Sequence, residues 1–414
     1  MKIHLEYGLL MSFLVGLLAA YLIPVKISLF LMIVDGFVSI FMLLAPFVVF
    51  LILFNSACSL MVNRKVAGRV IESSMVFFAS LVVGCSVFAS VFLSFLLPSS
   101  TSPVWFSEET FSHVSQIVLT SLVRPVTVAL FLGVAFALGF SYTPLFQRVI
   151  DLSKRMHGAQ EQAFNLLLKI FPIITMSLGA SLYYNLGKVS IEAYVVSMML
   201  TMLFGAAALA ILFIFVAKLT HRETAGLARY STGMFAIGLS VGSSYVILPL
   251  ALKAFREHFD ADNSVGDLVL TLGASVNRCG SVMGVLIVTF VAAHYTGAAV
   301  SWQQMLLLAV PVALIGFGSP GIQGGTLLVA MPVILHVISP TDGMKFVAVA
   351  LAMFVGGTTF IQAAVNTVAS GYIALLVDNS TRAQSRSVCL AKTEMTTFSE
   401  QFYSSSGNSS SEDG

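Results

Sequence analysis

Long apolar segments, several of them longer than a membrane is thick, constrain this chain more than any other feature of its sequence. Ten of them follow one another, at 8–24, 27–61, 70–98, 110–143, 161–186, 189–217, 225–252, 266–294, 303–338 and 344–377. A helix of about 20 apolar residues crosses the hydrocarbon core of a bilayer. Only 10% of the residues are charged, against about 25% in soluble domains. The sequence therefore predicts an all-α polytopic membrane protein, with the run from Gly8 to Ile23 as its first transmembrane helix.

The composition and motifs exclude several classes of function. A net charge of +2 leaves no basic stripe, so no nucleic-acid partner is expected. The four cysteines share no CxxC spacing and the histidines form no HExxH motif, which argues against a disulfide framework or a zinc site. The sequence has no paired intramembrane aspartates, no credible Ser–His pair and no P-loop. We therefore expect neither an enzyme nor an ATP-driven pump, and no cofactor; the expected partners are lipid and a small solute.

Lys and Arg residues in short loops predict which side of the membrane each loop occupies, because cytoplasmic loops carry the excess of positive charge. Basic loops at 64–69, 148–155 and 218–229 follow the second, fourth and sixth segments. The loop 98–112 between the third and fourth segments has no Lys or Arg. This alternation predicts six ordinary crossings with a cytoplasmic N-terminus.

Segment 225–252 is predicted to enter the membrane and return to the same side. Basic residues stand at both of its ends, Arg229 near its start and Arg256 after it. Its centre carries the helix-breaking run Gly242-Ser243-Ser244, so each arm is too short to span. The segment therefore forms a re-entrant hairpin open to the cytoplasm.

Segment 303–338 is predicted to form a second hairpin, open to the outside. The last segment must end in the cytoplasm, because the tail after it carries Arg382, Arg386 and Lys392. Two ordinary helices at 303–338 would instead place this basic tail outside. Residues 316–325 again supply a Gly- and Pro-rich interruption. Two oppositely oriented hairpin–helix pairs form an inverted repeat, and interrupted helices in such repeats mark the central site of transporters.

Segment 266–294 carries the residues with the most specific chemistry. Gly273, Ser275, Asn277 and Gly280 stand so close together that the helix is expected to unwind there. Arg278 lies in the same stretch, and burying it in a membrane costs from roughly 2.5 to above 10 kcal/mol. Two interpretations remain open: Arg278 binds a substrate carboxylate or replaces a bound cation, or it is a structural arginine held by helix-end carbonyls.

These motifs resemble those of the dicarboxylate/amino acid:cation symporter family, which includes the glutamate transporters. Residues 243–249 (Ser-Ser-Tyr-Val-Ile-Leu-Pro) are similar to the family's serine-rich first-hairpin tip, which is followed by Leu-Pro. Residues 273–280 (Gly-Ala-Ser-Val-Asn-Arg-Cys-Gly) stand where the family has Gly-Ala-Thr-Ile-Asn-Met-Asp-Gly. Residues 315–325 resemble the second tip, and Val365-Asn366 the Val-Asn of the last helix. The chain is identified as a divergent member.

The resemblance implies eight transmembrane helices plus two re-entrant helical hairpins, arranged as glutamate-transporter-like inverted repeats. It implies three regions: 1–223, a six-helix region with the scaffold and part of the transport domain; 224–378, the hairpin–helix–hairpin–helix transport core; and 379–414. The Ser-rich composition of 379–414 predicts a disordered cytoplasmic tail. A homotrimer in the bacterial inner membrane is expected, with both termini cytoplasmic.

The function implied is cation-coupled symport, with Na⁺ or H⁺, of an amino acid or dicarboxylate by an elevator-type mechanism. The alternative is an uncoupled facilitator or channel with the same fold. The substrate-binding residues implied are Ser243, Ser244, Arg278, Gly318, Ser319, Thr359, Gln362 and Asn366. The cation-binding residues implied are Gly273, Ser275, Asn277, Asn366 and Ser370.

Four positions depart from the family's pattern. Cys279 and Ser370 replace sodium-site aspartates, and Thr359 and Gln362 replace the Asp and Arg of the last helix. Because loss of carboxylates weakens cation binding and Arg278 repels a nearby cation, we expect reduced sodium coupling, or none. Gln362 and Thr359 suit a neutral polar solute, whereas Arg278 would still bind a carboxylate.

Overall fold

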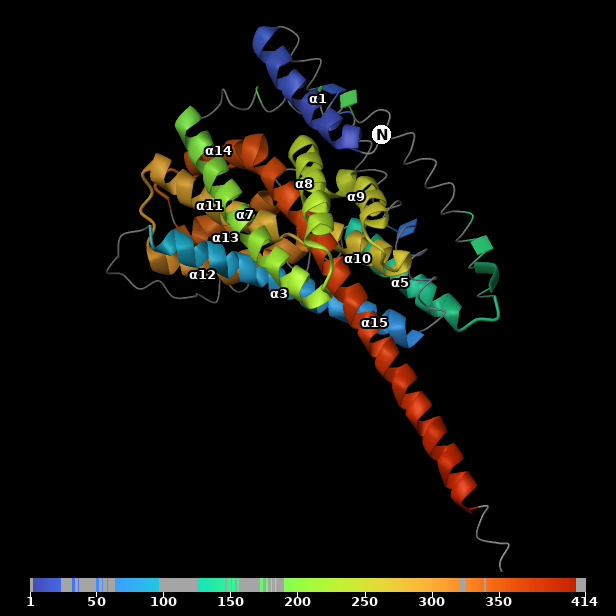
Figure 1. Ribbon diagram of the computed structural model, residues 1–414. Helices are drawn as coiled ribbons and strands as arrows, with labels where there is room; N and C mark the ends of the chain where they lie inside the picture. The colour runs from blue at the N-terminus through green and yellow to red at the C-terminus, as the bar shows by residue number, and fades with distance from the viewer. Residues whose placement is uncertain are drawn as a thin grey trace, which may run out of the picture.

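The computed structural model describes residues 3–23, 64–96, 125–145, 190–319, 325–338 and 340–406, with isolated residues and short pieces between 32 and 183. These parts of the chain are built from helices, and no strand occurs among them (Figure 1). The N-terminal half contributes α1 (Ile3–Leu22), α3 (Arg64–Ser94), α5 (Pro125–Ser141) and α7 (Ile191–Thr220). The C-terminal half contributes α8 (Thr224–Val241), α9 (Ser244–His258), α10 (Asn263–Val276), α11 (Cys279–Thr296), α12 (Trp302–Gly318), α13 (Gly325–Ile338), α14 (Gly343–Met353) and α15 (Thr359–Ser406). The predicted all-α class is confirmed.

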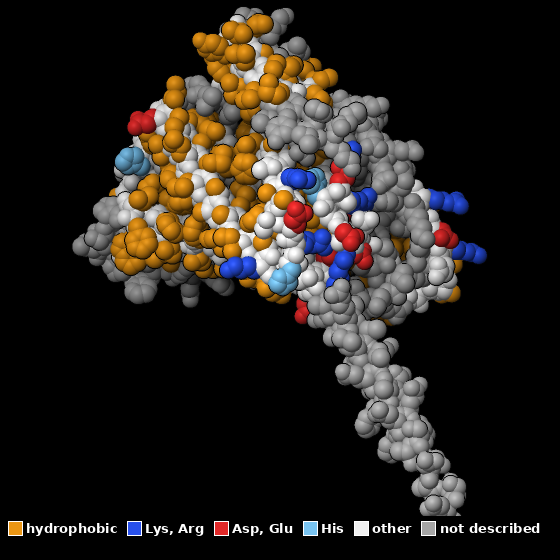
Figure 2. Space-filling view, in the orientation of Figure 1, with side chains coloured by type: hydrophobic (Ala, Val, Ile, Leu, Met, Phe, Trp, Pro, Cys, Tyr) orange, Lys and Arg blue, Asp and Glu red, His pale blue; other side chains and the backbone are white. Residues whose placement is uncertain are grey.

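Four described stretches are long and apolar enough to cross a membrane: 67–94, 191–220, 263–296 and 359–382. Within 263–296 and 359–382, 89% and 100% of the most apolar window is buried inside the protein, against 39% and 22% in the other two. Helices α10, α11 and α15 therefore form the centre, whereas α3 and α7 turn apolar faces outward. Figure 2 shows hydrophobic side chains over much of one face. Predicted segments 27–61 and 161–186 lie largely outside the described residues.

The predicted interruption of segment 225–252 is confirmed, and α8 and α9 pack against each other as a helical pair. Helix α8 ends at Gly242, whose φ of +68° lies in the left-handed region that glycine tolerates. Its N–H donates to the carbonyl oxygen of Gly238 at 3.0 Å, and α9 begins two residues later. Helices α12 and α13 form a second packed pair. The residues that join them, 320–324, lie outside the described part of the chain.

The predicted unwinding of segment 266–294 is confirmed as well. Helix α10 ends at Val276 and α11 begins at Cys279, with Asn277 (φ −75°, ψ 102°) and Arg278 (φ −117°, ψ 25°) between them. Both backbones leave the α region, so helical carbonyls and N–H groups are left without intrahelical partners at this point. Segment 344–377, unlike the two broken segments, is helical throughout. Within it, a π-helical turn at Phe354–Thr358 joins α14 to α15. Such turns are rare and often occur at functional sites.

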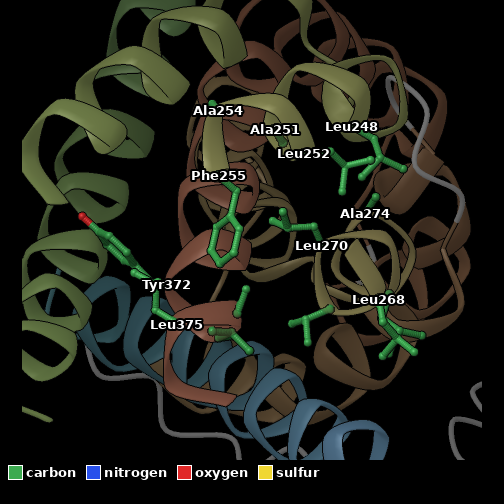
Figure 3. Packing of buried hydrophobic residues seen from close by; sticks show 14 of the residues in the cluster. Leu248, Ala251, Leu252, Ala254, Phe255, Leu268, Leu270, Ala274, Tyr372 and Leu375 are labelled. Atoms are coloured by element: carbon green, nitrogen blue, oxygen red, sulfur yellow. The ribbon is translucent and has the colours of Figure 1, made fainter. Parts of the chain in front are cut away.

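Two hydrophobic clusters surround these breaks. In the first, Phe255 of α9 packs with Leu268 and Leu270 of α10 and with Tyr372 and Leu375 of α15 (Figure 3). The second joins α11 to α12, α13 and α14 through side chains that include Leu286, Val288 and Ile334. Each cluster covers one end of the broken helix α10–α11. The break is therefore enclosed by packed side chains from elements far apart in the sequence.

The C-terminal region differs from the prediction of a disordered tail over 379–414. Helix α15 continues to Ser406 and projects beyond the bundle (Figure 1). A helix that is already nucleated and buried can be extended at little cost, because nucleation is the unfavourable step. Composition predicted the absence of a core in this region, but it does not account for a helix that continues from a buried one.

Candidate functional site

A small polar cavity lies where the helix breaks meet. It is lined by Gly242, Ser244, Arg278, Ser281, Thr326, Phe354, Thr359, Gln362, Ala363 and Asn366. These residues come from the α8–α9 junction, the start of α11, the start of α13, and the π turn with the first part of α15. The cavity has room for about one water molecule. An organic solute would therefore need one of the walls to move.

Arg278 is the one charged residue among the described residues of this cavity, and only 2% of its surface is exposed. Its Nη2 donates to the carbonyl oxygen of Ala274 at 2.8 Å, and its Nη1 lies 3.5 Å from the Oγ of Ser244. The guanidinium carbon stands 5.6 Å from the centre of the Tyr245 ring. Both interpretations of the sequence have a structural counterpart, because Arg278 is held by a helix-end carbonyl and also lines the cavity.

Asn277, beside Arg278 in the break, binds the last helix rather than the cavity. Its Nδ2 donates to the main-chain oxygen of Asn366 at 3.0 Å and to the Oγ of Ser370 at 3.0 Å. The Ser370 hydroxyl in turn donates to the oxygen of Asn366 at 2.8 Å. A Cβ added at Gly273 would lie 2.6 Å from the Ser370 Oγ, so only glycine permits this close approach of α10 to α15. The break is thereby fixed to the middle of α15.

The side chain of Asn366 fixes the start of α11 in the same way. Its Oδ1 accepts from the Gly280 N–H at 2.7 Å and from the Cys279 thiol at 3.6 Å, and its Nδ2 donates to the Oγ of Ser281 at 3.1 Å. One buried asparagine therefore satisfies an N–H at the start of α11 that has no intrahelical partner. Asn366 was predicted to bind substrate and cation, and it lines the cavity while its amide is engaged with α11.

The π turn orients the two polar residues that stand at the family's Asp and Arg positions. The Thr359 hydroxyl donates to the oxygen of Phe354 at 2.5 Å, and Gln362 Nε2 donates to the Thr358 hydroxyl at 2.9 Å. Gly284 lies against the Gln362 amide and leaves no room there for a Cβ. Both side chains are thus held on the cavity wall by bonds within their own continuous helix, and Gln362 also by close packing with α11.

Five of the eight predicted substrate residues line the cavity: Ser244, Arg278, Thr359, Gln362 and Asn366. Ser243 and Ser319 do not, and the Ser319 hydroxyl bonds to the Gly316 oxygen at 3.0 Å and to Thr326 at 2.9 Å, whereas the surroundings of Gly318 lie outside what the structure describes. The prediction missed Gly242, Ser281, Thr326, Phe354 and Ala363. Ser281 carried a usable signal, since it lies one helical turn from Arg278. Thr326 and Phe354 carried none, because only the fold brings their helices to this cavity.

The predicted cation residues form a hydrogen-bonded group without a carboxylate. Asn277, Asn366 and Ser370 are joined as described, and the Gly273 oxygen accepts from the Asn277 N–H at 2.9 Å. Ser275 is buried, and its Oγ has no hydrogen-bond partner among the described residues. Carbonyl, hydroxyl and amide oxygens are ligands that hard cations accept. The residues therefore fit a weak Na⁺ site, and an ion would have to compete with the bonds that now occupy these oxygens.

Comparison with known proteins agrees with this arrangement. Residues 5–380 match the model of the sodium:dicarboxylate symporter family. The chain is also similar to a serine/threonine transporter, SstT, from Acinetobacter baylyi, with 22% identity over 375 residues that cover 86% of this chain and 92% of that protein. One assignment follows from three findings. The chain has apolar helices that could span a membrane, its helix breaks meet at a buried polar cavity, and the family model matches nearly the whole chain. The chain belongs to the sodium:dicarboxylate symporter family and is a multi-pass membrane transporter, not an enzyme.

Proposed function

We propose that the protein is a secondary active transporter that carries an amino acid or a dicarboxylate together with Na⁺ or H⁺. The observation that carries the proposal is the meeting of two helical pairs and two irregular helices at one buried polar cavity. Irregular backbone at membrane depth is tolerated where it lines a cavity or is buried in protein, and transporters place their sites there. We place substrate binding at this cavity.

The proposed topology has eight transmembrane helices and two re-entrant hairpins, α8–α9 and α12–α13. Helices α9, α12 and α13 have 15, 17 and 14 residues. At about 1.5 Å per residue each is shorter than a hydrocarbon core of about 30 Å. The basic loops support cytoplasmic termini in a bacterial inner membrane.

An elevator-type mechanism is supported by the way the N-terminal helices pack. Helix α3 packs on α11, α12 and α15, and α7 packs on α11 and α15. Their outward faces expose apolar side chains such as Val76, Phe92, Met199 and Ile211. We propose that α3 and α7 move with the core 224–378, as one transport domain, against a scaffold formed by the rest of 1–223. The family resemblance supports a homotrimer of such scaffolds.

Purified protein reconstituted into liposomes is expected to accumulate a labelled solute against its gradient when a cation gradient is imposed. Labelled serine, aspartate, malate and succinate would be tested with inward Na⁺ or H⁺ gradients, and empty liposomes give the background. Collapse of the gradient with an ionophore should release the accumulated solute. Uptake that only equilibrates, whichever gradient is applied, would instead establish the second candidate, an uncoupled facilitator.

The second candidate, an uncoupled facilitator, is favoured by the positive charge of Arg278 at the cavity. Arg278 places a permanent positive charge beside Asn277 and Cys279, and none of the described residues that line the cavity is an acid. A fixed cation opposes the binding of a mobile one nearby. Sodium dependence is therefore the property on which the two candidates differ most.

We expect Na⁺ to give the native protein little more thermal stability than the same concentration of choline. In the double variant Arg278→Met, Cys279→Asp, Na⁺ should raise the unfolding midpoint, because a carboxylate replaces a thiol and the competing charge is gone. Cys279→Ser is the matched control that adds no charge. A sodium-specific rise in the native protein, equal to that of the double variant, would contradict this expectation.

A further inference from the structure

The cavity carries a full positive charge that no negative charge balances among its described lining residues. Between Asp267 and Asp378 the sequence contains a single acid, Asp342. The Asp342 carboxylate accepts a main-chain N–H at the start of α14, at 3.0 Å. Asp267 and Asp378 form ion pairs with other arginines. None of these three acids is therefore the counter-ion of Arg278.

The groups that hold Arg278 in the described part of the chain are all neutral. They are the Ala274 carbonyl, the Ser244 hydroxyl and the face of the Tyr245 ring. The Nε of Arg278 is buried and has no hydrogen-bond partner among these residues. A buried charge without an opposite charge is unfavourable, and its unused donor adds to the cost. An anionic ligand in the cavity would relieve both.

The helix ends that face the cavity carry partial positive charge, the same sign as the charge of Arg278. Helix α9 begins at Ser244, α11 begins directly after Arg278, and Thr326 lies in the first turn of α13. The N-cap residues Ser243 of α9 and Arg278 of α11 make no side-chain cap hydrogen bond, whereas the first two N–H groups of α11 donate to the side chains of Asn277 and Asn366. Helix N-termini carry partial positive charge and bind carboxylates and phosphates. Three of them meet here, with an arginine that can bind a carboxylate through two parallel hydrogen bonds.

A ligand ammonium group would have no comparable partner. Thr359 and Gln362, on the α15 wall, already donate to Phe354 and Thr358, and neither carries charge. The Asn366 Oδ1 accepts from Gly280 and Cys279. An ammonium in this cavity would lose its hydration, meet no carboxylate and lie close to Arg278.

We infer that the cavity binds an organic carboxylate that carries no ammonium group, with Arg278 as its counter-ion, and that it rejects α-amino acids. This inference rests on the proposed transport function. It narrows the proposed substrates from amino acids or dicarboxylates to carboxylates without an ammonium group. Arg278 is the specificity-determining residue. Its charge selects the anion, and the lack of an acid among the described lining residues excludes the zwitterion.

Two matched sets of ligands test the inference in the purified full-length protein by isothermal titration calorimetry. Succinate, malate and aspartate share a skeleton and differ at one carbon, which carries hydrogen, hydroxyl or ammonium. Lactate and alanine repeat the comparison with one carboxylate. We expect succinate or malate to bind at least about tenfold more tightly than aspartate, and lactate more tightly than alanine. Arg278→Gln should abolish this preference, and Arg278→Lys should retain part of it.

Equal or tighter binding of aspartate than malate by the native protein would overturn the inference, and that comparison needs no variant. So would malate binding of native strength in a folded Arg278→Gln protein, or binding of none of the five ligands. Liposome uptake separates the two levels of the proposal. Uptake of serine or aspartate in preference to malate would refute the inference and leave the transport function standing. Tight malate binding without any flux would refute the transport function and leave the site's selectivity standing.

Discussion

Gly238→Ala is expected to lower the thermal stability of the protein markedly and to weaken the contact between α8 and the last helix, α15. Gly238 lies in α8, where a Cβ would stand 2.6 Å from the Ala364 Cβ and 2.7 Å from the Ala364 main-chain nitrogen. Backbone atoms cannot rotate away, so α8 itself must shift. Overpacking of a tight interface costs about 1–3 kcal/mol, and this contact is with backbone. Small residues that let helices approach closely are a general device of membrane proteins.

Gly226→Ala is the matched control for this substitution. Gly226 lies in the same helix, and a Cβ there would have open space around it. Alanine is about 1 kcal/mol more favourable than glycine inside a helix, so this variant should be as stable as the native protein or slightly more so. The unfolding midpoints of the three detergent-solubilised proteins, followed by circular dichroism, would decide. Equal midpoints for Gly238→Ala and Gly226→Ala would show that the α8–α15 contact is looser than described.

Asp378→Ala is expected to have the second large effect, at the other end of the core. Asp378 is a buried residue of α15 that accepts hydrogen bonds from Arg222 at 3.2 Å, from Arg382 at 3.1 Å and from the N–H of Asp262 at 3.1 Å. These bonds join α15 to the α7–α8 junction and to the α9–α10 loop. Figure 2 shows charged side chains gathered in this region.

Removing Asp378 takes the carboxylate away from two arginines and the acceptor from a main-chain N–H, although both arginines still donate to the main-chain oxygen of Asp260. Loss of one partner of a buried ion pair costs about 3–5 kcal/mol. The side chains of Arg222 and Arg382 are 22% and 45% exposed, so water compensates them in part. A loss of about 1–3 kcal/mol is therefore expected. Arg382→Ala removes only the more exposed partner and should cost less than about 1 kcal/mol. Similar unfolding midpoints for the two variants would contradict a central role for Asp378.

The sequence by itself located the helix breaks in segments 225–252 and 266–294, but not the π turn at Phe354–Thr358. Gly242 and the closely spaced Gly273, Ser275 and Asn277 are local signals, because backbone conformation depends on the residue's own side chain and its neighbours. The resemblance to a family also placed Ser244, Arg278, Thr359, Gln362 and Asn366 in the site, and all five line one cavity. The sequence left open whether Arg278 binds a ligand or is a structural arginine held by helix-end carbonyls.

Local signals could not identify partners. Nothing near Asn277 in the chain indicates that its amide binds Asn366, 89 residues away, or that the Asn366 amide satisfies the first turn of α11. Thr326 and Phe354 reach the cavity only because α13 and the π turn pack against α11. These positions depend on which helix faces lie together, and the residues next to them in the chain carry no signal for that.

Hydrophobicity thus determined that this chain lies in a membrane, because about 20 apolar residues in a row have no other stable environment. It did not determine which spans face lipid. The windows in α10–α11 and α15 are the less apolar of the four, with mean hydropathies of 1.7 and 1.6, and they are 89% and 100% buried. The more apolar windows of α3 and α7 are largely exposed. Only the tertiary structure decided this, because polar residues in a membrane protein must find their hydrogen-bond partners inside the protein.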